Sequence, residues 1–157
     1  MAFDLSGALL DAWATNNRIN EYLLRNLPPE AWRAAPPGGR GRNPAAIAAH
    51  MHNVRLMWLK AADKSAELPA KLEGDGFGPE EAVASLEASW RALESVLRTA
   101  LESGGAVKGF KPDAAGFAAY LLAHDAHHRG QITLLARLSG HPVSRSVNFG
   151  MWEWGTR

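Results

Sequence analysis

The chain has 157 residues, of which 46% are hydrophobic and 21% charged, with a net charge of +1. This length and composition fit one domain with a buried core. The sequence has no run of about 18 apolar residues, so it predicts no membrane span. The absence of cysteine excludes disulfides, thiolate nucleophiles and cysteine-ligated metals. With 17 basic and 16 acidic residues, nothing favours binding to nucleic acid or a lipid surface. The N-terminus does not resemble a signal peptide, so we expect a cytoplasmic protein.

Four long segments have helical periodicity and are separated by proline and glycine. The second begins with Asn43 as N-cap and Pro44 in the first helical position, which is a strong start signal. The expected helices cover about 4–27, 44–63, 80–102 and 114–139. We therefore predict one all-α domain over 1–157, a four-helix bundle of up-down type with a core at about 5–140 and an irregular tail at 141–157.

Polar side chains interrupt the apolar stripe of the last long helix. His124 and His128 are four residues apart and so share the buried face, together with Gln131. His127 falls at the edge of this stripe, whereas Asp125 and Arg129 point away from its centre. This pattern places two imidazoles on one face of the bundle core.

The first two helices add polar groups to the same core. His50 and Trp58 lie on the apolar stripe of the second helix, whereas His52 is roughly opposite and is expected at the surface. Trp13, Asn16 and Asn20 align on the stripe of the first helix. His141, just before Pro142, is interpreted as an ordinary turn residue.

Three inward-facing imidazoles suggest a divalent metal ion. Buried polar groups without partners cost on the order of 1–3 kcal/mol each, and neutral imidazole is the commonest metal ligand. His50, His124 and His128 would supply three ligands and leave a position open for water or substrate, as in catalytic sites. Nitrogen ligands suit zinc, nickel or iron(II). The alternative is a set of hydrogen-bonded core histidines, because helix register decides whether His50 meets the other two.

Segment 124–132, HDAHHRGQI, resembles the H-x-x-x-H-R-G-Q-I signature of the DinB/YfiT-like superfamily of metalloenzymes. Two further segments support the resemblance. In 47–51 a single histidine interrupts an apolar helix, and in 13–24 an asparagine follows an aromatic residue. The similarity covers about 5–140, which is most of the chain.

The resemblance implies a helical bundle that binds a metal through His50, His124 and His128, and it implies a homodimer. Family members with known activity include transferases and isomerases that use low-molecular-weight thiols such as mycothiol or bacillithiol. For this chain it implies a metal-dependent transferase or hydrolase acting with such a thiol or with metal-bound water. The substrate would be a small molecule.

Other functions remain open at this stage. The site could belong to a non-catalytic ligand-binding or stress-response module, with Trp13 and Trp58 lining a cavity. A metalloprotease is disfavoured because Asp125 replaces the glutamate of H-E-x-x-H and no distal ligand is present. A bundle without metal is a further alternative. In the enzyme hypothesis His127 is a candidate proton shuttle, and Gln131 could orient a ligand or water.

Three expectations concern the flanks of the motif. Arg129 is expected to form an ion pair or contact the tail, and Gly130 to permit close helix approach. The aromatic tail residues Phe149, Trp152 and Trp154 are expected to pack over the bundle or a partner subunit. The alternative for the tail is a lid or wall of the substrate pocket.

Overall fold

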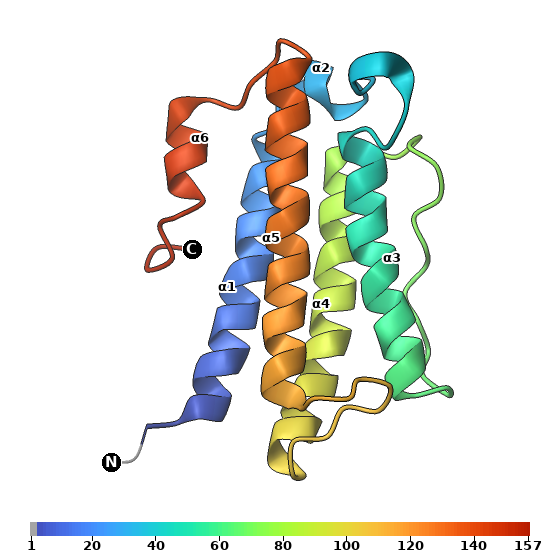
Figure 1. Ribbon diagram of the computed structural model, residues 1–157, viewed down its shortest axis with the longest axis vertical. Helices are drawn as coiled ribbons and strands as arrows, with labels where there is room; N and C mark the ends of the chain where they lie inside the picture. The colour runs from blue at the N-terminus through green and yellow to red at the C-terminus, as the bar shows by residue number, and fades with distance from the viewer. Residues whose placement is uncertain (1–2) are drawn as a thin grey trace.

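In the computed structural model, which describes residues 3–157, four long helices form a bundle (Figure 1). They are α1 (Leu5–Arg25), α3 (Pro44–Ala62), α4 (Pro79–Glu102) and α5 (Ala114–Leu138). The chain also contains a short α2 (Pro29–Trp32), a 3-10 turn η1 (Pro37–Gly39) and α6 (Arg145–Gly150). The all-α four-helix prediction is thus confirmed.

The helices do not simply alternate in direction. The connection 63–78 runs back along the outside of the bundle, so α3 and α4 run in the same direction (Figure 1). α1 and α5 both run opposite to them. The up-down expectation therefore holds for α1 with α3 and for α4 with α5, but not for α3 with α4. The long connection allows the parallel arrangement, because it spans the length of α3.

Side-chain caps fix the start of three long helices. The Asp4 carboxylate accepts a hydrogen bond from the Gly7 amide, and the Asn43 side chain accepts one from the Ala46 amide. Asp113 does the same for Gly116 at the start of α5. Each cap satisfies a backbone donor that the helix leaves unpaired. The Asn43-Pro44 start is where the sequence predicts it.

The prediction of an irregular tail is wrong in part, because residues 145–150 form α6. Ser144 caps this helix by accepting a hydrogen bond from the Val147 amide. Val147 and Val143 are buried in the main hydrophobic core, so they anchor the tail to the bundle. The helix is too short to show helical periodicity, which is why the sequence did not reveal it.

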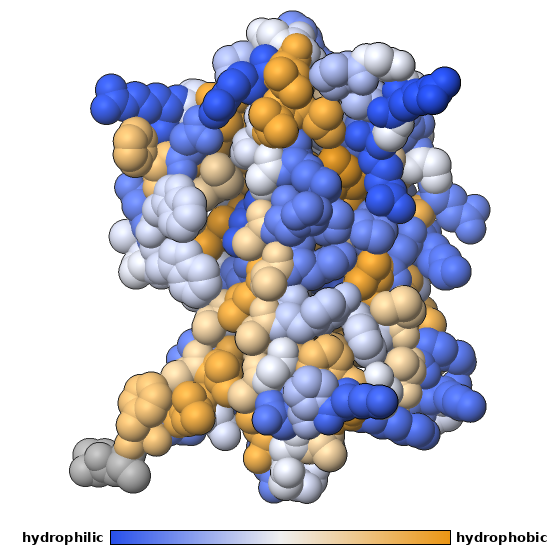
Figure 2. Space-filling model, in the orientation of Figure 1, coloured by the Kyte–Doolittle hydropathy of each residue, from blue (hydrophilic) through white to orange (hydrophobic). Residues whose placement is uncertain are grey.

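The hydrophobic core has two parts, stacked along the bundle axis. One contains residues from α1, α2, α3 and α6, and the other is centred on Trp13, Leu93 and Phe117. On the face in Figure 2, hydrophobic residues form patches among hydrophilic ones. No helix in residues 3–157 has the length and apolarity needed to cross a membrane.

Candidate metal centre

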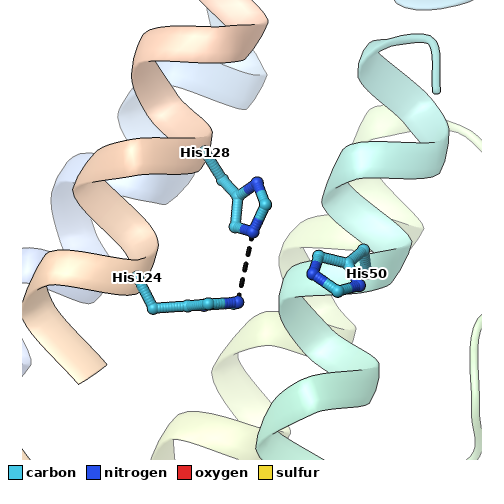
Figure 3. A group of neighbouring side chains, drawn as sticks. All are labelled: His50, His124 and His128. Carbon is cyan, nitrogen blue, oxygen red and sulfur yellow. Dashed lines mark hydrogen bonds between the residues drawn. The ribbon is translucent and has the colours of Figure 1, made fainter. Parts of the chain in front are cut away.

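Three histidines from two helices converge between α3 and α5. His50 projects from α3 toward His124 and His128 on α5 (Figure 3), and one ring nitrogen from each lies within 4.8 Å of the others. The Nε2 atoms of His124 and His128 are 3.1 Å apart. Two nitrogens bound to one tetrahedral zinc ion at about 2.0–2.1 Å lie about 3.3–3.4 Å apart, so the spacing fits a shared ion.

Hydrogen bonding and burial prepare the rings to act as ligands. His128 Nδ1 is 2.7 Å from the Gln131 Oε1 atom, which favours the tautomer that leaves the His128 Nε2 lone pair free. Burial, the Arg42 charge and the two neighbouring histidines lower the pKa of His50 to about 4. Burial also lowers the pKa of His128. Both imidazoles are therefore neutral at pH 7, as metal binding requires.

The expectation that Asp125 points away from the core is wrong. This carboxylate is 1% exposed, and its Oδ2 atom accepts hydrogen bonds from Asn16, Asn20 and Arg55 at 2.7–2.8 Å. Burial alone would raise its pKa, but the Arg55 charge and these hydrogen bonds hold the pKa of Asp125 well below its usual range. Its other oxygen, Oδ1, lies 3.7 Å from His124 Nδ1, so the ionised group flanks a candidate ligand.

Arg55 is the residue of this network that sequence reasoning missed. It is 1% exposed, pairs with Asp125, donates to Asn17 and the Leu86 carbonyl, and lies over the Trp13 ring. The sequence carried one signal, which is a basic residue on α3 matched by an acidic residue beside His124. Helical periodicity places both residues off the apolar stripe, because it assumes that each helix is buried on one side only.

The other predicted site residues lie around the histidines in different ways. Asn16 and Asn20 are buried but bind Asp125 rather than a histidine. Trp13 lies under Arg55. Trp58 packs against Phe110, Phe117 and Tyr120, and the Tyr120 ring stacks on His124. His127 is exposed beside His128 and does not join the cluster.

The prediction that His52 lies at the surface is also wrong. His52 is fully buried between α3, α4 and the connection 63–78, with Nδ1 at 3.1 Å from the Ser89 hydroxyl and Nε2 at 2.9 Å from the Ala70 carbonyl. The side of α3 opposite the histidine cluster is covered because α4 runs alongside it. His52 is thus a satisfied core histidine.

A cavity of about 320 Å³ lies next to the histidine cluster. Gln131, which contacts His128, forms part of its wall, and so do Arg40 and Arg42 from the loop before α3. The Arg42 charge also helps to lower the pKa of His50. A molecule in this cavity would lie beside two cationic side chains and beside Gln131, the hydrogen-bond partner of His128.

Comparison with known proteins gives one family and one solved structure. The family model of the DinB superfamily matches residues 12–132. A crystal structure of a protein from Exiguobacterium sibiricum 255-15, assigned provisionally to the DinB family, is 21% identical with a TM-score of 0.63. The alignment covers 94% of this chain and 99% of that chain, and at this identity it supports the fold alone. None of the curated proteins matches this chain.

Proposed function

The chain belongs to the DinB superfamily, and we propose that it binds one divalent metal ion through His50, His124 and His128. The observation that carries the proposal is the convergence of one ring nitrogen from each histidine. In the described part of the chain, no cysteine, aspartate, glutamate or further histidine completes a fourth protein ligand in this cluster. Three nitrogen ligands with an open position are typical of catalytic sites.

The surrounding residues support binding rather than a purely structural role for the histidines. Gln131 orients His128, and the ionised Asp125 lies beside His124. Carboxylate and amide partners of this kind hold ligating histidines in one orientation and increase their basicity. The nitrogen donor set suits zinc, nickel or iron(II).

Metal analysis of the purified, untagged protein tests the proposal. We expect about one equivalent of zinc, nickel or iron per chain by mass spectrometry, and we expect its loss in His50→Ala and His128→Ala. His127→Ala is the matched control, because this histidine is exposed on the same helix outside the cluster. The proposal is wrong if no metal is found or taken up, or if His128→Ala keeps the wild-type content.

We further propose that the site is catalytic and acts as a metal-dependent transferase or hydrolase. When bound, the ion would supply Lewis acidity, which lowers the pKa of a coordinated water or thiol. The chain has no cysteine, so any reacting thiol would come from a low-molecular-weight cofactor. Arg40 and Arg42 beside the cluster favour an anionic substrate or thiol.

Turnover assays separate this enzyme hypothesis from the alternative of a non-catalytic binding module. Thiols such as mycothiol and bacillithiol would be tested with small electrophiles, and activated esters without thiol. We expect turnover that disappears in His50→Ala and changes in KM when Arg42→Gln removes the nearby cation. Metal binding without turnover on either substrate set would support the binding module.

The proposal extends to a homodimer located in the cytoplasm. Leu134 and Leu138 on α5 are more than half exposed and could form part of an interface between copies. Light scattering during size-exclusion chromatography measures the mass of the assembly directly.

A further inference from the structure

A second cavity lies on the opposite side of α5 from the histidines. It measures about 490 Å³ and is lined by residues of α5, α1 and the C-terminal tail, and we call it the tail cavity. Its α5 wall includes Ala126, Arg129 and Gly130, whereas His124, His128 and Gln131 project from the other side of the same helix. The tail cavity is therefore separate from the candidate metal centre. Its volume suits a small organic molecule.

One end of the tail cavity carries an unbalanced positive charge. Arg129 Nη1 donates to the Asn16 and Asn20 side-chain oxygens, both at 2.6 Å. These amides in turn donate to Asp125, whose charge is already paired with Arg55. Two guanidinium groups thus share one buried carboxylate.

Two acidic residues, one on α1 and one in the tail, are paired with other arginines. On α1, Glu21 pairs with Arg25, and in the tail Glu153 pairs with Arg157. No ion pair to Arg129 forms in residues 3–157, and no acidic residue lines the tail cavity. An anion in the cavity would stabilise this arrangement.

The rest of the wall is mostly apolar and aromatic, apart from Thr133 and Asn148. Leu122, Ala123, Ala126 and Met151 contribute apolar surface, and Trp152 and Trp154 contribute indole rings. Trp152 is 79% exposed, which is unusual for a large aromatic side chain. Trp152 therefore does not pack over the bundle, whereas packing of the tail against a partner subunit stays a prediction.

Contacts of residues other than the tryptophans hold the tail in place. The Arg157 guanidinium lies 3.7 Å from the centre of the Tyr22 ring on α1, and its Nε donates to the Gly150 carbonyl. Arg18 donates to the Arg157 carbonyl. Figure 1 shows the tail folding back beside α1 and α5, and in Figure 2 the outline of the molecule is hollowed below it. Trp152 and Trp154 are thus free to contact a ligand.

We propose that the tail cavity is a binding site for a small organic anion that combines a carboxylate with an aromatic group. Arg129 faces the carboxylate, and Trp152 and Trp154 contact the aromatic group. Charge-assisted hydrogen bonds contribute roughly 1.5–3 kcal/mol each, which corresponds to about a ten- to hundredfold preference for the anion over a neutral analogue.

Calorimetric titration of the full chain with a matched pair of compounds tests this site. Naphthalene-2-carboxylate is the probe, and naphthalene-2-carboxamide is its neutral counterpart of nearly the same shape. We expect the carboxylate to bind at least about tenfold more tightly, and the difference to shrink with added salt because the interaction is ionic. The titrations are run with and without chelator, since a carboxylate could also bind a metal ion.

Four variants locate the site. Gly130→Leu should abolish binding by filling the cavity, because a Cβ atom at Gly130 meets nothing within 4 Å. Arg129→Gln should remove the preference for the anion, and Arg129→Lys should keep part of it. Trp152→Ala should weaken both compounds, whereas Phe149→Ala is the control, since Phe149 is exposed in the same tail but does not line the cavity.

Three results would overturn the proposal. The first is equal affinity for the two compounds, and the second is no binding of either at millimolar concentration. The third is carboxylate binding that survives Gly130→Leu but disappears in His50→Ala or with chelator, which would place the anion at the metal centre. Carboxylate binding that persists in His50→Ala supports the tail cavity whether or not the proposed metal site exists.

Discussion

Asp125 connects the candidate metal centre with the tail cavity. Its Oδ2 atom receives hydrogen bonds from Arg55, Asn16 and Asn20, and Arg129 binds the same two asparagines. Its Oδ1 atom faces His124. A single buried carboxylate therefore links α1, α3 and α5, and its one charge is shared by two guanidinium groups. These hydrogen bonds order the polar centre of the bundle, whereas one positive charge stays unbalanced at Arg129.

Replacing Asp125 should destabilise the fold. Asp125→Asn leaves two guanidinium groups without an anion, and breaking a buried ion pair on one side costs about 3–5 kcal/mol. The free energy of unfolding from urea titration measures this loss. Asp11→Asn, on the exposed side of α1, is the control and should change stability by less than about 0.5 kcal/mol. If Asp125→Asn lowers the free energy of unfolding by less than about 1 kcal/mol, the two guanidinium groups do not depend on this carboxylate.

The pKa of His50 predicts a pH dependence in the metal-free protein. Its folded-state pKa of about 4 is below the ordinary value of 6.5, so the unfolded chain takes up a proton first as the pH falls. Stability should therefore decrease from about pH 6.5 to about pH 4, and His128 should contribute in the same direction. Urea titrations in chelator across this range measure the effect.

His50→Gln isolates the contribution of this ring. The variant should lose stability less steeply between pH 6.5 and 4 than the wild type, because one titrating group is gone. His141→Gln, at an exposed turn, is the matched control and should follow the wild-type curve. If both variants and the wild type show the same slope, protonation of His50 is not linked to folding.

Helical periodicity predicts His50, His124 and His128 as inward-facing, but it misplaces His52 and Asp125. A prediction from helical periodicity assumes that each helix has one buried side. α3 is instead covered by α4 and by the connection 63–78 on the side of His52, and α5 faces α1 on the side of Asp125. The sequence therefore predicts which residues share a face, whereas the number of covered faces depends on tertiary packing.

At the level of helices, Gly130 within α5 has no packing role in this chain. A Cβ atom there would meet nothing within 4 Å, so the expectation that Gly130 permits close helix approach is wrong. The residue is exposed and lines the tail cavity. Glycine therefore weakens the helix here without a compensating contact in the described structure.

Gly130→Ala should consequently stabilise the protein. Alanine is favoured over glycine inside a helix by about 1 kcal/mol, which corresponds to roughly 2–4 °C in Tm for a chain of this size. Gly116→Ala is the comparison in the same helix, because its Cβ would lie 3.1 Å from Pro112 Cβ and 3.3 Å from Asp113 Oδ1. Gly116→Ala should therefore gain less stability than Gly130→Ala, or should lose stability. Thermal unfolding that ranks Gly116→Ala above Gly130→Ala would contradict the packing argument.

Helix boundaries follow closely from local sequence signals. Asn43-Pro44 and Asp113 mark helix starts through capping, and Gly140 follows the end of α5, all of which are short-range effects. The parallel direction of α3 and α4 and the formation of α6 could not be predicted in this way. Both depend on where the connection 63–78 and the tail pack, and those segments carry few periodic residues.

For the molecule as a whole, a metal ion at the histidine cluster would join α3 to α5. The unfolded chain keeps His124 and His128 near each other but separates both from His50, so it should bind the ion more weakly. Binding to the folded state alone at a hundred times Kd adds about 2.7 kcal/mol of stability. This corresponds to roughly 5–11 °C in Tm at about 2–4 °C per kcal/mol.

Thermal unfolding of the chelator-treated protein with added zinc measures this coupling. The wild type and His127→Ala should gain the full shift, because His127 lies outside the cluster. His50→Ala should lose most of it although both α5 ligands remain, since the ion then no longer connects two helices. An equal shift in His50→Ala would place the ion on α5 alone, through His124 and His128. The three-histidine centre would then be wrong even if the protein contains metal.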